Sequence, residues 1–402
     1  MTAPRILVVS PAIPFPPLGG SRTRIYHLLR ALSARFDAVL IGFSYGEKTV
    51  TPPFPIELIT VDWEWPDRYR AMQLGDADAT RALTSSAEPW LASILESDRF
   101  EAELRRIVAE VDLVIFEGTG MGRFLHSVPS EIPRVLDLYD IHSAMALRDA
   151  ESQTGPGRQT ALAEAERTLK FERRVASACD LCLTCSDVDA ARARDLLGVD
   201  HVEVIPNGVD TSYFRPNLEP PFPGTLLFSG KMDYSPNVQA AVRFARDILP
   251  LVRRRRPEMI FHIVGLNPVP EVLALAAPDV VVHGAVPDMR PHYRRAEQVV
   301  VPLLHGGGTR LKILEAAASG KAIVTTSIGV EGLRFAPADD LVVADGPVEF
   351  AEAIVQLTTD PGRRSRLGAH ARAAALAYDW GAIGNEFCKV LLPSRVRTLA
   401  RI

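Results

Sequence analysis

VPLLHGGGTRLKILEAAASGKAIVTTSIGVEGL, residues Val301–Leu333, is the most informative stretch of the chain. An apolar run opens it, three glycines follow at Gly306–Gly308, and the chain then continues into a short helix expected over 310–319 and a β-branched strand over 322–327. A glycine-rich loop that leads into a helix N-terminus presents backbone N–H groups and the positive end of the helix dipole to an anion. The stretch therefore predicts a strand–loop–helix unit that can hold a nucleotide diphosphate.

Short apolar strands alternate with helices along the rest of the chain in the same way. Two such series imply two α/β domains with parallel sheets, and right-handed crossovers would bring the carboxyl ends of both sets of strands to a shared cleft. The expected strands are 5–10, 38–43, 55–61, 112–118, 134–140, 180–186, 224–230, 259–265, 281–286, 298–303, 322–327 and 340–345. The expected helices are 25–32, 90–110, 158–178, 187–197, 236–255, 310–319, 347–358, 360–377 and 381–394.

Prolines cluster between residues 205 and 222, which marks the expected boundary between the domains. The first domain is predicted to comprise 1–207 together with a returning C-terminal helix in 381–402, and the second to comprise 208–380. The YDW sequence at 378–380 marks the point where the chain turns back. Two domains also agree with a length of 402 residues, which exceeds what one hydrophobic core usually serves.

Composition excludes several classes of protein. Hydrophobic residues make up 47% and charged residues 23%, as in ordinary globular proteins, and a formal net charge of −4 does not fit a general nucleic-acid binder. The apolar run at 6–10 is too short for the core of an export signal, and no run of eighteen apolar residues predicts a membrane span. We therefore expect a cytoplasmic protein.

Cys179, Cys182 and Cys185 form a C-x-x-C-x-x-C pattern that could indicate a metal or iron–sulfur site. The sequence around them, however, is typical of a buried strand, on which side chains three positions apart point to opposite faces. The strand interpretation is favoured, and no metal site is predicted.

Two groups of arginines leave a peripheral contact with the inner membrane face open. Arg253–Arg256 ends a helix and is best explained as a solvated face that suits the helix dipole. On the first helix, arginines could meet the phosphates of a lipid acceptor, although their spacing does not make one basic face. These are Arg22, Arg24, Arg30 and Arg35.

Four motifs spread over nearly the whole chain carry a family resemblance. They are LGGSRTRIYHLLRAL (18–32), VIPNGVDTSYF (204–214), FSGKMDYSPN (228–237) and GGGTRLKILEAAASGKAIVTTSIGVEGL (306–333). With these motifs the chain resembles the retaining glycosyltransferases of family 4 (group 1 glycosyltransferases), which have the GT-B fold. The resemblance implies two Rossmann-like domains facing a central cleft, with a C-terminal helix that crosses back to the first domain.

The resemblance also implies an activity. Such enzymes move a sugar from a nucleotide diphosphate donor, here a UDP-, GDP- or TDP-sugar, to an acceptor hydroxyl of a cell-surface glycan, a lipid or a natural product, with retention of the anomeric configuration. The donor binds mainly to the second domain and the acceptor mainly to the first. Many members need no metal or other cofactor, because basic side chains and helix N-termini neutralise the diphosphate.

The donor site implied by the resemblance lies mostly in the second domain. Lys231, which follows Gly230, occupies the position of a phosphate-binding basic residue, and Glu315 the position that accepts hydrogen bonds from the ribose. Because Arg310 and Lys312 are two residues apart, only one of them is expected to be central. The remaining candidates are the loop amides of Gly307, Gly308 and Thr309, and, in the first domain, Gly19 and Gly20, which lack a Cβ atom and let the backbone approach a phosphate closely.

One position departs from the family pattern, which often has a glutamate eight residues before Glu315. That position is Gly307 here. Since the missing glutamate usually helps to hold the donor sugar, the role is expected to pass to His305 or to the amides of Gly306–Gly308.

Asp140 and His142 follow a strand of the first domain and are the candidates for contacting the acceptor or the donor sugar, with Lys231 and Arg310 as their catalytic counterparts in the second domain. Glu117 and Thr119 are weaker candidates. No covalent nucleophile is expected, because in a reaction of this type the acceptor attacks from the face of the leaving group and the donor phosphate takes its proton.

Two alternatives stay open at this point. A nucleotide-sugar 2-epimerase shares the two-domain plan, and the glycine at 307 also permits a non-catalytic subunit that binds nucleotide sugars. A dinucleotide oxidoreductase is disfavoured, because no G-x-G-x-x-G follows the first strand.

Overall fold

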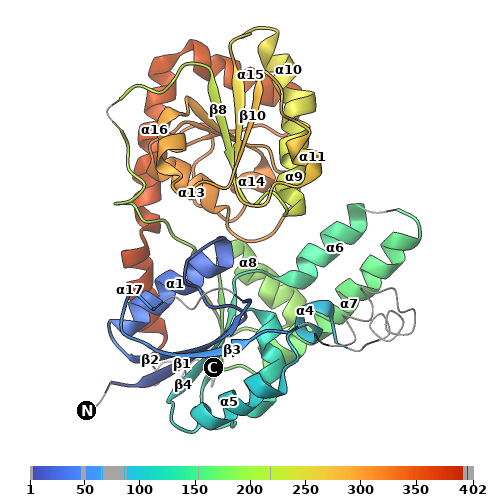
Figure 1. Ribbon diagram of the computed structural model, residues 1–402, viewed down its shortest axis with the longest axis vertical. Coiled ribbons are helices and arrows are strands. Elements are labelled where there is room, and N and C mark those ends of the chain that lie inside the picture. Colours follow the sequence, from blue (N-terminus) through green and yellow to red (C-terminus); the bar gives the residue numbers. More distant parts are fainter. Residues whose placement is uncertain are drawn as a thin grey trace. The chain divides into compact units, whose positions relative to one another are not determined.

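A computed structural model describes residues 3–46, 51–64, 66, 86, 88–152, 154–217, 219–392 and 396. The chain divides into two compact units: unit 1 consists of Met1–Pro206 with Ile383–Ile402, and unit 2 of Asn207–Ala382. Each unit is built on one parallel β-sheet with helices packed around it (Figure 1). The predicted α/β class, with two Rossmann-like domains, is confirmed.

Unit 1 contains seven strands in the order β3-β2-β1-β4-β5-β6-β7. The central strands are buried on both faces, as expected for a parallel sheet, and Figure 1 shows α1 (Gly20–Ser33) and α5 (Asp98–Val108) on opposite faces. The strands are β1 (Arg5–Ser10), β2 (Asp37–Ser44), β3 (Glu57–Asp62), β4 (Leu113–Glu117), β5 (Arg134–Leu138), β6 (Leu181–Thr184) and β7 (Val202–Val204).

The helices of unit 1 differ from expectation in two places. The region predicted as one helix over 90–110 is two helices, because the Ser97 side chain caps α5 by accepting a 3.2 Å hydrogen bond from the Phe100 amide. The segments η1 and α6 were not predicted. The remaining helical elements are α4 (Trp90–Ser93), η1 (Thr119–Ser127), α6 (His142–Ser152), α7 (Pro156–Ser177), α8 (Asp187–Arg192) and η2 (Ala193–Leu197).

Unit 2 contains six strands in the order β10-β9-β8-β11-β12-β13. They are β8 (Thr225–Ser229), β9 (Ile260–Val264), β10 (Val280–Gly284), β11 (Gln298–Val301), β12 (Ile323–Thr325) and β13 (Val342–Val343). The helical region predicted over 236–255 is α9 (Ser235–Arg243), a π-helical turn η3 (Phe244–Ile248) and α10 (Leu249–Arg253), since Pro250 interrupts the hydrogen-bond ladder. The other helices are α11 (Pro270–Leu273), α12 (Arg290–Arg295), α13 (Leu311–Ala318), α14 (Ser327–Val330), α15 (Pro347–Thr359), α16 (Pro361–Ala375) and η4 (Leu376–Tyr378).

The chain returns to unit 1 within helix α17 (Trp380–Val390). Gly384 lies against Ala31 of α1, where a Cβ atom would come within 2.5 Å of the Ala31 Cβ. The Arg35 guanidinium donates a 2.8 Å hydrogen bond to Asn385. The end of the predicted helix, at 393–394, lies outside the described residues. In the part of the chain that the structure describes, no helix is both long and apolar enough to cross a membrane.

The three clustered cysteines are buried in unit 1, and only Cys182 lies within β6. Cys179 and Cys185 flank the strand, so the strand expected over 180–186 is shorter than predicted. Burial raises the pKa of the Cys182 thiol to about 12, and it also raises the pKa values of the other two. All three thiols are therefore held in their neutral form, which is unreactive.

Arg24 of α1 is fully buried in unit 1, where it meets Asp137 of β5. Its Nε and Nη2 atoms bind the two carboxylate oxygens at 2.7 and 2.9 Å, and Nη1 donates to the Ile205 carbonyl at 2.8 Å. Although burial alone would lower the pKa of Arg24, the Asp137 carboxylate outweighs it and raises that pKa. Arg24 is therefore not available to the phosphates of a lipid acceptor, contrary to the sequence-based suggestion.

Because removing one partner of a buried ion pair leaves the other charge uncompensated, Arg24→Gln is expected to lower the free energy of unfolding by about 3–5 kcal/mol. Chemical denaturation monitored by circular dichroism measures this loss. Arg30→Gln is the matched control, since Arg30 is an exposed arginine of the same helix. Equal stability of the two variants would contradict the assigned role of the Arg24–Asp137 pair.

Candidate functional site

The loops of interest in unit 2 leave two neighbouring strands. β8 and β11 pair side by side, although β9 and β10 lie between them in sequence, so the strand order reverses there. Gly230 and Lys231 follow β8, and the loop 302–310 follows β11. In open α/β sheets, ligands bind at such a switch point beyond the carboxyl ends of the strands.

Gly230, Asn237 and Lys312 come together at this switch point. The Lys312 Nζ donates a 2.6 Å hydrogen bond to the Asn237 Oδ1, and the Asn237 Nδ2 donates a 2.9 Å bond to the Lys231 carbonyl. A Cβ atom at position 230 would lie 2.8 Å from the Asn237 Nδ2 and 2.9 Å from the Lys312 Nζ. Glycine is therefore required at 230 to leave room for the ammonium group.

Lys312, in the first turn of α13, is a partly buried cation. Its Nζ lies 4.4 Å from the centroid of the Phe228 ring, a cation–π arrangement. Burial and the nearby Arg310 charge lower the pKa of Lys312 to about 7. An ammonium held this far from bulk water gains more from a bound anion than an exposed lysine does.

Glu315, one turn further along α13, is held by a buried hydroxyl. The Tyr293 hydroxyl donates to the Glu315 Oε2 at 2.8 Å and lies 3.0 Å from the Ser229 Oγ. Burial raises the pKa of Glu315 to about 7, although both the Tyr293 hydrogen bond and the Lys312 charge lower it. The carboxyl group is thus fixed in position and balanced between its charged and neutral forms near neutral pH.

Arg310, just before α13, organises the glycine loop. Its guanidinium donates to the carbonyls of Gly306 (3.1 Å), Gly307 (2.6 Å) and Gly308. It also reaches the Ile328 carbonyl at 3.3 Å. The buried guanidinium therefore links three carbonyls of the loop to one another and to the Ile328 carbonyl.

The backbone N–H groups of the loop differ from its carbonyl groups in their hydrogen bonding. Among the described residues, the N–H groups of Gly307, Gly308 and Thr309 donate to no protein acceptor. Gly308 has a φ of 64°, in the left-handed region that favours glycine. Three unpaired amides beside a helix N-terminus form an anion-binding arrangement.

Lys231 and His305 lie at the exposed rim of this arrangement. The Lys231 side chain is 53% exposed, and its Nζ lies 3.3 Å from the Asp233 carboxylate. His305 is half-buried. Both side chains are therefore accessible from solvent.

In unit 1, Gly19 precedes α1 with a φ of 90°, again in the left-handed region, and Gly20 is the first residue of the helix. No atom lies within 4 Å of the position that a Cβ atom would occupy at Gly19. The backbone at the N-terminus of α1 is therefore open to the approach of a ligand.

His142 and Asp140 follow β5, and Glu172 of α7 positions the histidine. The fully buried Glu172 accepts hydrogen bonds from the amides of His142 (2.8 Å) and Ser143 (3.0 Å), which caps α6. The His142 Nδ1 lies 3.7 Å from the Glu172 Oε1. Burial lowers the pKa of His142, but the nearby negative charges of Glu172 and Asp140 outweigh burial and raise it.

The weaker candidates Glu117 and Thr119 are both buried, with exposed fractions of 2% and 0%. Burial and the Asp137 charge raise the pKa of Glu117 well above its usual value. The Thr119 hydroxyl donates to Glu172 at 3.2 Å. Both side chains therefore support the interior of unit 1 rather than facing a ligand.

Comparison with known proteins defines the class. Residues 18–213 match the family model described as Glycosyltransferase Family 4, and residues 223–360 match the model described as Glycosyl transferases group 1. A D-inositol 3-phosphate glycosyltransferase of Xylanimonas cellulosilytica is 30% identical over an aligned length of 411 residues. The match covers 95% of this chain and 94% of that protein. The chain therefore belongs to the family 4, group 1 glycosyltransferases.

A second relative is matched only in part. A D-inositol 3-phosphate glycosyltransferase of Kineococcus radiotolerans is 30% identical over 261 residues, so the match covers 58% of its length and 54% of this chain.

The crystal structure of Anabaena Alr3699/HepE in complex with UDP and glucose is 15% identical in sequence to this chain. Its TM-score is 0.70, over 96% of this chain and 99% of that one. At this identity the likeness establishes the shared GT-B fold.

Three residues of these sites were not predicted from the sequence as site residues. Asn237 ends the FSGKMDYSPN motif, so its position in that motif was an available signal. Tyr293 and Glu172 carry no such signal, because each meets its partner only through the fold, across 22 residues for Tyr293 and Glu315 and 30 for Glu172 and His142.

The raised pKa of Glu315 has a consequence for stability. A carboxyl group whose pKa rises from 4.5 to about 7 on folding binds a proton more tightly in the folded state, so its contribution to stability falls as the pH rises from 4.5 through 7. Glu315→Gln keeps an acceptor for Tyr293 but carries no charge. Relative to the wild type, its free energy of unfolding should rise by about 1 kcal/mol or more between pH 5 and pH 8.

Denaturant titrations of both proteins at the two pH values measure this difference. Glu349→Gln, which removes an exposed carboxylate elsewhere in unit 2, is the control. A stability difference between wild type and Glu315→Gln that does not change with pH would contradict the burial of this charge.

Proposed function

We propose that this protein is a retaining glycosyltransferase that transfers a glycosyl group from a nucleoside diphosphate sugar to an acceptor hydroxyl. The observation that carries the proposal is the set of unpaired amides of Gly307, Gly308 and Thr309 beside the partly buried Lys312 ammonium. Membership of family 4 supports it, as do the bound UDP and glucose named for the Anabaena relative of the same fold.

The donor diphosphate binds at the β8–β11 switch point of unit 2. The loop amides and Lys312 contact its oxygens, and the accessible Lys231 reaches it from the rim. When the glycosidic bond breaks, negative charge grows on the leaving diphosphate, and fixed N–H donors and cations stabilise that charge without reorganising. This set of donors can neutralise the diphosphate without a metal ion.

Glu315 accepts hydrogen bonds from the donor ribose. Tyr293 occupies one of its carboxylate oxygens, which leaves the other for the ribose hydroxyls. Gly307 replaces the glutamate that often holds the donor sugar in this family, so the sugar is held by the loop amides and by His305.

Arg310 acts through the loop and not by direct contact with the donor. Its guanidinium binds three loop carbonyls, which orients the corresponding amides and adds positive charge to the loop. Arg310 is thus a positioning residue in this proposal.

In unit 1, His142 and Asp140 contact the acceptor or the transferred sugar, and the open backbone at Gly19 and Gly20 approaches the donor. The acceptor hydroxyl attacks on the face that the diphosphate leaves, and a phosphate oxygen of the leaving group takes its proton. No covalent bond to the protein forms. Inositol phosphate is the first acceptor to test, because curated relatives are named for it.

Lys312→Met is expected to raise the Kd for a nucleoside diphosphate about tenfold or more, because it removes one charge-assisted hydrogen bond to phosphate. Lys231→Ala should have a smaller effect, since solvent screens an exposed lysine. Isothermal titration calorimetry with UDP, GDP and TDP gives these constants.

Arg254→Gln serves as the control for both variants, because it removes an exposed positive charge of unit 2 away from the switch point. Unchanged affinity in both lysine variants would place the diphosphate elsewhere and overturn the donor site.

The choice between transfer and epimerisation rests on products. Each nucleotide sugar is incubated with and without inositol phosphate, and the products are resolved by ¹H NMR. Transfer predicts a new glycoside of retained configuration that forms only with the acceptor. A changed sugar in the absence of the acceptor would indicate an epimerase, and no turnover while donor binding persists would indicate a non-catalytic subunit.

A further inference from the structure

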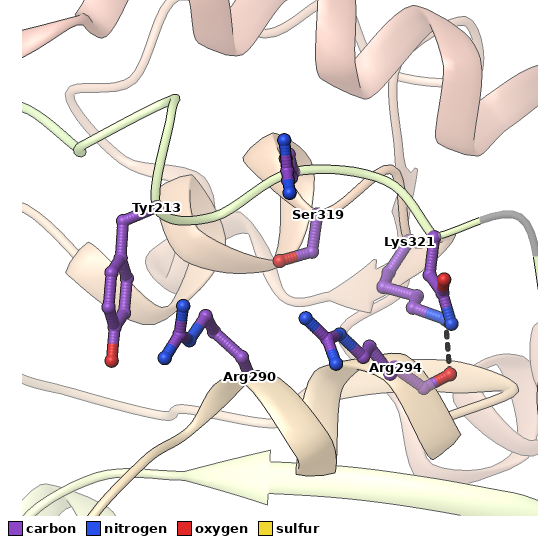
Figure 2. A pocket seen from close by; sticks show the side chains of 7 residues that line it. Tyr213, Arg290, Arg294, Ser319 and Lys321 are labelled. Carbon is purple, nitrogen blue, oxygen red and sulfur yellow. Dashed lines mark hydrogen bonds between the residues drawn. The ribbon is translucent and has the colours of Figure 1, made fainter.

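A second cluster of cations in unit 2 takes no part in the proposed donor site. Tyr213, Arg215, Asn217, Arg290, Arg294, Ser319 and Lys321 line a small open pocket (Figure 2). Its space is about 250 Å³ when the mouth open to solvent is included. The lining is almost entirely polar, and four of the seven side chains are basic.

Among the described residues, three of these cations have no counter-ion. The guanidinium groups of Arg215 and Arg294 meet no carboxylate, and the Lys321 ammonium meets only carbonyl groups. Arg290 is paired with Asp288 at 2.9 and 3.0 Å, and this carboxylate also accepts a bond from Tyr213. The pocket therefore keeps an excess of positive charge.

Two arginines of the pocket lie on the same face of one helix. Arg290 and Arg294 are four residues apart on α12, so they share one face of a short helix, where like charges repel. Figure 2 shows both guanidinium groups directed into the same hollow, with the Ser319 hydroxyl pointing toward them from the end of α13. A bound anion would remove this repulsion.

The walls of the pocket are fixed in place. The Arg290 guanidinium carbon lies 4.1 Å from the centroid of the Tyr213 ring. Arg372 ties the 211–214 segment to the end of α13 by donating to the carbonyls of Thr211, Phe214 and Ala318 at 2.9–3.1 Å. A ligand therefore meets Arg290, Tyr213 and the backbone around the pocket already in place, which lowers the cost of ordering them on binding.

Lys321 closes one side of the pocket. Its Nζ donates to the carbonyls of Arg294 (2.9 Å) and Ala296 (3.0 Å), which close the last turn of α12. An ammonium group has three N–H donors, so one remains for a ligand. The guanidinium groups of Arg215 and Arg294, the Lys321 ammonium and the Ser319 hydroxyl surround this small space and match the tetrahedral oxygens of a single phosphoryl group.

We propose that this pocket is a binding site for the phosphoryl group of a small soluble phosphoanion, separate from the donor diphosphate site at the Gly306–Thr309 loop. The two sites lie at opposite ends of α13, whose eight residues span about 12 Å. This inference does not depend on the proposed transferase activity.

Titration of the full chain with inorganic phosphate and with glycerol phosphate, at constant ionic strength set with chloride, tests the proposal. Binding is followed by thermal shift and by ³¹P NMR line width. Phosphate should stabilise the wild type, and Arg215→Gln combined with Arg294→Gln should raise the apparent Kd about tenfold or more. Both arginines are exposed, so the double variant should fold normally.

Two controls locate the site. Arg254→Gln, which removes an exposed arginine outside the pocket, should leave phosphate binding unchanged, and the double variant should still bind nucleoside diphosphate. The proposal is overturned if the wild type does not bind phosphate, or if phosphate binding survives the double variant but is lost in Lys312→Met. Binding only to vesicles that contain phosphatidic acid would also overturn it, because the ligand would then be a membrane surface.

Discussion

The reversal of strand order between β8 and β11 determines where the candidate site of unit 2 forms. Because both strands are parallel neighbours, their carboxyl ends meet at one edge of the sheet, yet the segments that follow them diverge. Lys231 and the glycine loop are therefore close in space although about 75 residues separate them. α13 begins at this edge, so the loop amides of residues 307–309 that precede it, and Lys312 and Glu315 within it, are all brought to the same place.

A buried polar network then fixes the side chains at that edge. Lys312 is held by Asn237, and Glu315 is held by Tyr293, whose hydroxyl also meets Ser229. Both ionisable groups have pKa values shifted to about 7, in opposite directions from their usual values, by burial. Without a ligand this network costs free energy, because Lys312 and Glu315 both lose hydration on folding. A bound diphosphate and ribose supply new partners for these two groups, so the free energy gained on binding is larger here than at an exposed site.

The sequence predicts the framework of the molecule better than its contacts. Strands such as β1 and β11 are evident as β-branched runs, and the glycine loop predicts an anion site, because both predictions depend on local sequence. By contrast, the burial of Arg24 depends on Asp137, 113 residues away, and the α6 helix begins where the distant Glu172 caps it. The roles of Tyr293 and Glu172 could not be predicted, since only the fold brings each to its partner.

Hydrogen–deuterium exchange of the full chain, with and without a saturating nucleoside diphosphate, shows whether the glycine loop of unit 2 holds the diphosphate. If the unpaired amides of Gly307, Gly308 and Thr309 bind the diphosphate, exchange should slow in peptides that cover 303–312 and 229–237, and the slowing should disappear in Lys312→Met. Saturable nucleotide binding that leaves exchange in both segments unchanged would contradict the account.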